Sequence, residues 1–171
     1  MVVIILSAFL FSGTTFAQKV KLTDPEIAST AVTANQVDIN QAAVAKQRSK
    51  NIAVLHFAET MANDHKAIIA QVVALVTKLK VTPKDNAVSR KLNADAAKTI
   101  ALLKTKSGKD FDRAYIDNEV IYHKTLISVL KRTLIPAATD AELKELLKKV
   151  VPALKVHLEH AEIIQKEIKI K

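Results

Sequence analysis

Residues 50–79 read KNIAVLHFAETMANDHKAIIAQVVALVTKL, a stretch without proline or glycine that decides the class of the fold. Apolar or small residues recur in it every three or four positions, which is the spacing of one face of an α-helix. This stripe consists of Ile52, Leu55, Ala58, Ala62, His65, Ile69, Val72 and Val76. The pattern predicts one long helix that carries a histidine, His65, on its apolar face.

The rest of the chain predicts four further helices. Their expected ranges are 25–47, 86–106, 109–134 and about 140–168. Asp24 and Pro25 favour the first start, because aspartate caps helices and proline suits the first turn. Pro83 ends the helix over 50–79, since proline cannot continue a helix interior. Short connections predict an all-α fold, an antiparallel four-helix bundle with 86–106 as an additional shorter helix. A regular five-helix arrangement is the open alternative.

The first seventeen residues, MVVIILSAFLFSGTTFA, are uncharged, mostly apolar and end in a small residue. This run is too short to span a bilayer together with its flanks, and it is typical of a secretory signal peptide. We predict a signal peptide at residues 1–17 and a single helical domain at 18–171, with a buried N-terminal helix as the alternative. The expected location is secreted or periplasmic, with association with the outer membrane left open.

The composition restricts both the chemistry and the partners. The chain has no cysteine, so any metal must be held by histidine, aspartate, glutamate or water. A net charge of +9 comes from scattered lysines without interleaved aromatic residues, which argues against nucleic acid and favours an anionic envelope surface. A glycine-rich phosphate loop and a nucleophile motif are both missing from the sequence, so no catalytic residue is assigned.

Ionisable residues interrupt the apolar rows of the long predicted helices. His65, His123 and His157 lie on such rows in the second, fourth and fifth helices. Asp38 lies on a row of alanines in the first helix. Glu119 precedes His123 by one turn, so both side chains share one face. We infer that these residues form an inner polar set.

Heights along the helices predict how closely this set converges. At about 1.5 Å per residue from the turns, His65 and His123 lie level, whereas His157 lies one or two turns lower, nearer Asp38. A single compact site therefore requires shifts in register. His160 is offset from His157 by about 60°, toward the edge of the bundle, where it would be an entrance residue.

Two hypotheses explain the polar set equally well, and a third, catalysis without a metal, has less support. The first is a buried hydrogen-bond network that needs no metal. The second is a metal site built from facing helices. Its candidate ligands are His65, His123, His157, Glu119, Asp38 and His160.

Three separated motifs resemble a known family. They are MANDH at 61–65, FDRAY at 111–115 continuing to Val120 and His123, and HLEHA at 157–161. Their order behind a signal peptide is similar to that in the secreted bacterial family called domain of unknown function 4142, over residues 24–168. The resemblance implies a ferritin-like bundle labelled an outer-membrane or periplasmic protein, without an established activity, whose core histidines match His65, His123 and His157.

The chain departs from the ferritin pattern because it lacks a pair of Glu-x-x-His motifs. Imidazole-rich, thiol-free ligands therefore favour Cu or Zn over Fe. We expect an extracytoplasmic bundle that binds a transition metal through core histidines, in metal handling or envelope stress tolerance rather than catalysis. The alternative is a structural or interaction module of the envelope whose histidines are hydrogen-bonded without metal. The oligomeric state stays open.

Overall fold

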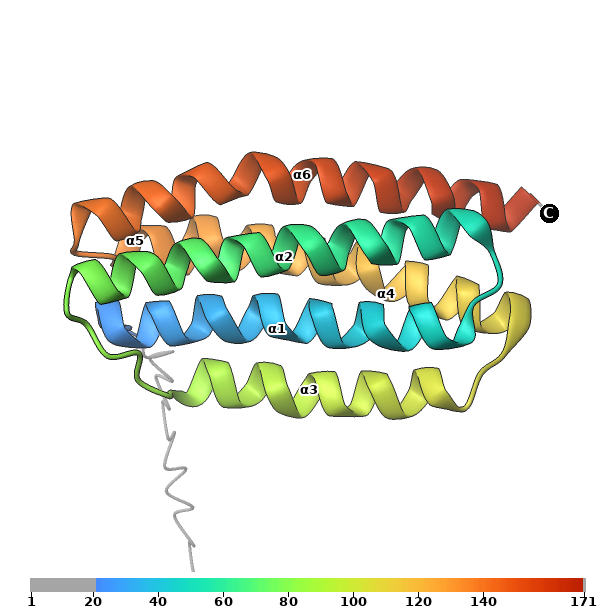
Figure 1. Cartoon of the computed structure of the whole chain (residues 1–171), viewed down its shortest axis with the longest axis horizontal. Coiled ribbons are helices and arrows are strands. Elements are labelled where there is room, and N and C mark those ends of the chain that lie inside the picture. Colours follow the sequence, from blue (N-terminus) through green and yellow to red (C-terminus); the bar gives the residue numbers. More distant parts are fainter. Residues whose placement is uncertain (1–20, 171) are drawn as a thin grey trace, which may run out of the picture.

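The computed structural model describes residues 21–170, which form helices and no strand (Figure 1). The elements are α1 (Asp24–Arg48), α2 (Ile52–Lys78), α3 (Ala87–Lys104), α4 (Gly108–Val129), the π-helix η1 (Leu130–Leu134), α5 (Ile135–Ala137) and α6 (Ala141–Ile170). The predicted signal peptide lies outside the described residues, and the domain boundary at residue 18 stays a prediction. Within residues 21–170, none of the helices combines the length and apolarity needed to cross a membrane.

Four long helical segments form the bundle. Helix α1 packs most extensively on α2, and α4 on α6, while α2 also contacts α6 and α1 contacts α4. The shorter α3 lies along the outside of α1 (Figure 1). The predicted all-α bundle of four long helices with an additional shorter one is therefore confirmed, with α3 as the covering element rather than an equal fifth member.

The start of α1 differs from its prediction in one respect. Thr23, not Asp24, caps the helix, and it forms a reciprocal capping box with Glu26. Asp24 instead reaches across to the chain segment before α6, where its carboxylate accepts hydrogen bonds from the backbone N–H groups of Thr139 and Asp140, both at 2.9 Å, and from the Thr139 hydroxyl. These hydrogen bonds therefore connect the start of α1 to the segment that precedes α6.

The fourth helical segment also differs from its prediction. Gly108, which lies between the predicted helices at 86–106 and 109–134, has a left-handed φ of 54° and begins α4. At the other end, the helix does not stop near Ile135 but passes through η1 into α5. Pro136 has no N–H to donate to the carbonyl four residues before it, and the wider π turn accommodates that loss.

The core consists of two apolar clusters separated by a polar layer. One cluster includes Ala34, Ile68, Leu126 and Leu154, and the other includes Ala42, Ala62, Val120 and Ala161. On each long helix, the residue between the two clusters is ionisable. These residues are Asp38, His65, His123 and His157, all buried. The polar layer consequently crosses the middle of the bundle.

Removal of the Asp24 carboxylate tests the tie between α1 and α6. Burial raises the pKa of Asp24, but the hydrogen bonds from Thr139 and Asp140 outweigh burial and hold that pKa below 3.8. Its stabilisation is therefore complete above pH 3.8 and is lost as the pH falls through the folded-state value. We expect Asp24→Ala to lower the free energy of unfolding by about 1–3 kcal/mol at pH 7, with a smaller loss for Asp24→Asn, which keeps one acceptor. Urea unfolding at pH 7 and pH 3 measures the free energy of unfolding of each variant relative to the wild type. An equal loss of stability at both pH values would contradict the role of the ionised Asp24 carboxylate.

Candidate metal centre

The polar layer brings together five side chains from all four long helices of the bundle. Asp38 comes from α1, His65 from α2, Glu119 and His123 from α4, and His157 from α6. The first four are completely buried, and His157 is 4% exposed. Each occupies a core-facing position of its helix, as the periodicity predicts. Because solvent does not reach these side chains, their polar atoms must find partners within the layer or among neighbouring protein groups.

The three imidazoles converge on one point. Their ring centroids lie 5.3 Å apart for His65 and His157, 5.5 Å for His123 and His157, and 5.7 Å for His65 and His123. One nitrogen from each ring lies within 4.8 Å of the other two. Asp38 Oδ2 lies 3.2 Å from His65 Nε2 and 3.6 Å from His123 Nε2. Atoms of Asp38, Glu119 and His123 form a second group within the same 4.8 Å limit.

The predicted difference in height of His157 is wrong, because His157 lies level with the other two histidines. Two reasons explain the error. The predicted heights start from turns at Ser49 and Thr139, whereas α2 begins at Ile52 and α6 at Ala141. Both errors placed the histidines too far from the turns. The predicted set therefore forms one compact site without any further change in register.

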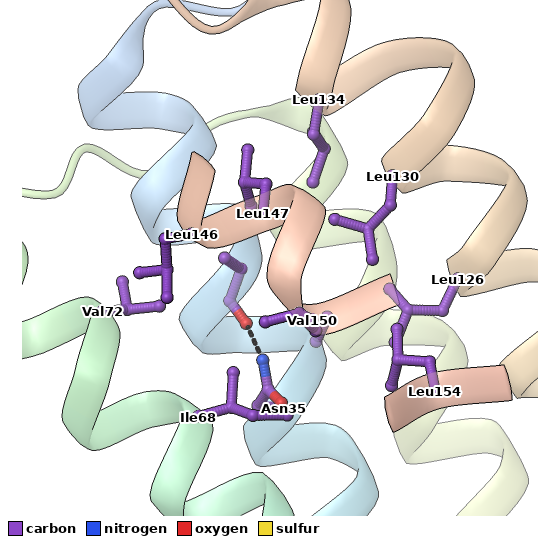
Figure 2. A pocket seen from close by; sticks show the side chains of 12 residues that line it. Asn35, Ile68, Val72, Leu126, Leu130, Leu134, Leu146, Leu147, Val150 and Leu154 are labelled. Carbon is purple, nitrogen blue, oxygen red and sulfur yellow. Dashed lines mark hydrogen bonds between the residues drawn. The ribbon is translucent and has the colours of Figure 1, made fainter. Parts of the chain in front are cut away.

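The outward nitrogen of each imidazole meets a hydrogen-bond acceptor. His65 Nδ1 lies 2.7 Å from Asn35 Oδ1, and His123 Nδ1 lies 3.0 Å from the Glu119 carbonyl oxygen. His157 Nε2 lies 2.9 Å from Asp64 Oδ2. The amide of Asn35 is itself oriented, because its nitrogen donates to the Ala31 carbonyl at 2.7 Å (Figure 2).

These acceptors determine the tautomer of each ring. A neutral imidazole has one N–H, and an acceptor beside one nitrogen places the proton there. The remaining nitrogens are His65 Nε2, His123 Nε2 and His157 Nδ1, and all three are buried without a hydrogen-bond partner. In His123 and His157 this leaves a lone pair that faces the interior of the layer, whereas His65 Nε2 also lies 3.2 Å from an acceptor, Asp38 Oδ2. Outer partners that orient imidazoles in this way are typical of histidines that bind metals.

The two carboxyl groups of the layer differ in protonation. Burial raises the pKa of Glu119 well above 4.5, and the charge of Asp38 adds to this, although the Tyr115 hydroxyl opposes it. Burial also raises the pKa of Asp38, but the imidazoles, His65 foremost, outweigh burial and hold that pKa below its ordinary value. Burial therefore favours the neutral acid at Glu119, whereas the imidazoles favour the ionised form of Asp38.

Burial affects two of the histidines as well. It lowers the pKa of His123 to about 4, although Asp38 opposes the shift. It also lowers the pKa of His157, against the hydrogen bond with Asp64. Both rings are neutral at pH 7, so they present lone pairs rather than protons to Asp38. All four carboxylate oxygens of Asp38 and Glu119 are buried without a hydrogen-bond partner.

His160 lies apart from this layer. Its ring packs edge-on against Phe57 at 5.3 Å and lies 6.4 Å from the exposed ring of His56. It belongs to neither group of candidate ligands found among residues 21–170. The structure therefore separates His160 from the five predicted ligands that it brings together. Its offset of about 60° from His157 on the helix explains this separation.

The family follows from comparison with known proteins. A family model described as "Domain of unknown function (DUF4142)" matches residues 11–164. The chain belongs to the DUF4142 family. The resemblance of the three sequence motifs is thus confirmed.

A solved structure supports the fold of this DUF4142 protein. It is a protein from Streptomyces coelicolor, described as "putative secreted protein DUF305", with a TM-score of 0.71 and 12% sequence identity. The match covers 84% of this chain and 92% of that one. At this identity the likeness shows the fold alone. No curated protein matches the chain.

One residue of this DUF4142 site escaped sequence reasoning. Asn35 orients His65, but it lies on a helix whose inner row consists mainly of alanines, where only Asp38 stood out. The signal that would have found it is its spacing of three residues from Asp38, which places both on one face. Asp64 and Tyr115 lie within the MANDH and FDRAY motifs, but their contacts with the layer depend on packing between helices.

Substitution of Glu119 by glutamine tests its protonation. Because the folded protein keeps this carboxyl protonated, its contribution to stability is complete below pH 4.5 and declines as the pH rises toward the folded-state pKa. Glutamine resembles the neutral acid and does not titrate. The stability of Glu119→Gln relative to the wild type should therefore rise with pH above 4.5, by up to about 1.4 kcal/mol per pH unit. Urea unfolding of the metal-free proteins from pH 4.5 to 7.5 measures this.

The matched control is Glu159→Gln at an exposed position of the same bundle. Its stability relative to the wild type should be nearly constant over the same pH range. Parallel curves for Glu119→Gln and the wild type would show that Glu119 is ionised in the folded protein.

Proposed function

We propose that this protein binds one transition metal ion in its polar layer through His65, His123, His157 and Asp38. The observation that carries the proposal is the convergence of three imidazole nitrogens, while the opposite nitrogen of each ring lies beside a hydrogen-bond acceptor. Glu119 lies close enough to supply a further oxygen. The role is metal handling or tolerance of envelope stress outside the cytoplasm, by binding rather than turnover.

The charge of the layer supports a cation. With the N–H groups of His123 and His157 directed outward, these rings offer no proton to the Asp38 carboxylate. A buried carboxylate without a partner is costly, and a divalent ion bound to Asp38 and the imidazoles removes that cost. The same ion would lower the cost of ionising Glu119. The layer thus favours a bound cation over an anion or a neutral molecule.

The donor set supports Cu(II) or Zn(II) over iron. Imidazole nitrogen suits both ions, and neither needs the several carboxylates that a di-iron centre uses. Zinc binds histidine nitrogen at about 2.0–2.1 Å, so the ligand atoms must approach one another more closely than their present spacing of up to 4.8 Å. Rotation of the side chains supplies this approach while the outer hydrogen bonds remain near their present positions.

Two observations support a location outside the cytoplasm. The uncharged apolar N-terminus predicts a signal peptide, and the Streptomyces coelicolor protein of the same fold is described as secreted. The net charge of +9 favours attraction to anionic envelope surfaces. Association with the outer membrane remains part of the proposal.

One distance favours a second candidate function. His65 Nε2 and Asp38 Oδ2 lie 3.2 Å apart, which suits a direct hydrogen bond from a protonated Nε2 atom to the carboxylate. In that case the layer is a metal-free network that sets the register of a structural or interaction module. This candidate predicts that histidine substitutions destabilise the bundle and that added metal does not change its melting temperature.

Calorimetric titration of metal-free protein with Cu(II), Zn(II) and Fe(II) distinguishes the two functions. We expect one ion of Cu(II) or Zn(II) per chain, with loss of this binding in a His65→Gln, His123→Gln, His157→Gln triple variant, because the converging nitrogens are gone. The matched control is His56→Gln with His160→Gln, which removes two imidazoles outside the layer and should bind like the wild type.

The Asp38→Asn single variant covers the case in which the triple variant does not fold. It should retain the helical circular dichroism spectrum and bind the ion at least 10-fold more weakly. Equal binding by the wild type and both layer variants would overturn the proposed metal function.

Asp64 tests whether the outer hydrogen bonds position the ligands. Its side chain is half-exposed, so its removal leaves no buried charge unpaired. We expect Asp64→Ala to weaken metal binding about 10- to 100-fold, the usual effect of losing such a partner. Asp64→Asn retains an acceptor for His157 Nε2–H and should recover most of the affinity. If both variants bind as the wild type does, Asp64 does not position His157.

A further inference from the structure

A small cavity lies inside the bundle between α1, α2, α6 and the segment formed by α4 and η1 (Figure 2). Its volume is about 20 Å³, larger than the roughly 10–15 Å³ that one water-sized molecule requires. The lining residues are Ala31, Ala34, Asn35, Ile68, Val72, Leu126, Leu130, Leu134, Leu146, Leu147, Val150 and Leu154. The space therefore suits one molecule of two or three atoms.

The walls of the cavity are apolar. Asn35 is the one polar side chain among the described lining residues, and both ends of its amide are already engaged. Its nitrogen donates to the Ala31 carbonyl, and its oxygen accepts from His65. A water molecule needs two to four polar partners, and apolar cavities of this kind stay dry and bind apolar guests. The lining thus excludes water, anions and peroxide.

The cavity lies one helical turn from the polar layer. Ile68 follows His65 by three residues, and Leu126 follows His123 by three. On the antiparallel partners, Leu154 precedes His157 by three residues, and Asn35 precedes Asp38 by three. Each ligand candidate therefore has a cavity-lining residue on the adjacent turn of its own helix, about 5 Å along the axis.

The π-helix contributes to the same cavity. Leu130 and Leu134, the first and last residues of η1, both line it, and Figure 2 shows their side chains directed inward from adjacent turns. A π turn adds a residue to the helix, and such insertions occur frequently at functional sites. The π-helical segment η1 therefore forms part of the cavity wall.

We propose that this cavity binds one small apolar molecule of the dioxygen class beside the polar layer. Its volume limits the guest to a diatomic molecule or a noble gas atom, and its lining selects an apolar one. The binding itself does not depend on a metal. The placement of the guest beside a bound ion rests on the proposed function.

Nuclear magnetic resonance of metal-free protein tests the cavity directly, with xenon and dioxygen as probes. We expect saturable shifts under xenon for the methyl groups of Ile68, Val72 and Leu130, and enhanced relaxation of the same methyl groups under dioxygen. Methyl groups of Val54 and Ile116, which belong to the other apolar cluster, should change little. Absence of saturable xenon shifts in the wild type would overturn the proposal.

Two filling variants locate the guest. Ala34→Leu projects a larger side chain into the cavity, and Val150→Leu adds one methylene group at the same wall, so that one filled variant remains if the other fails to fold. Both should lose most of the xenon response. Ala101→Leu, at an exposed helical position, is the matched control and should keep it. A full response in a folded filling variant would also contradict the proposal.

The outcome is independent of the metal titration, because the measurement uses metal-free protein. A xenon response with no metal binding would leave the cavity assignment intact and remove the proposed function. Metal binding without a xenon response would leave the proposed function intact and remove the cavity assignment.

Discussion

A negative charge buried at the middle of the bundle is the constraint that the surrounding side chains must satisfy. Asp38 is fully buried, and neither of its carboxylate oxygens has a hydrogen-bond partner. Three imidazoles surround this carboxylate, but the outer acceptors of His123 and His157 direct the N–H groups of those rings away from it. The layer is therefore short of positive charge. A bound cation would supply this charge, whereas the metal-free candidate relies on a hydrogen bond from His65 to Asp38, and the two functions proposed for the protein differ on that point.

The bundle can carry such a layer because apolar packing on both sides stabilises it. Burial of one large apolar side chain contributes about 1.5–3 kcal/mol, and each of the two clusters contains several, such as Phe57 and Met61 on one side and Leu130 and Leu147 on the other. These clusters pack the four long helices together on both sides of the layer. The apolar surroundings thereby fix the positions of the helices, so that an ion would require only rotation of the side chains in the layer.

Periodicity predicted the parts of the structure that depend on local sequence. The four long helical segments, the shorter fifth one and the inward positions of His65, His123 and His157 follow from spacing alone, because a helix repeats every 3.6 residues. The height of His157 does not follow from spacing, because it depends on where the turns end and on the relative axial positions of the helices. The π-helix at Leu130–Leu134 was missed for a similar reason, since its hydrogen-bond pattern reflects packing around Pro136 rather than a residue preference. His160 shares a motif with His157, but only the folded helix shows that its ring packs on Phe57.

The two sides of the polar layer differ in chemistry, and this difference connects the two proposals. Glu119 lies one turn from His123 on the side of the cluster that contains Tyr115, where a neutral carboxyl and a phenol offer protons. Leu126 lies one turn away on the opposite side, where the walls are apolar and Asn35 has no free polar atom. An ion held by the imidazoles would therefore face proton donors on one side and a dry cavity on the other.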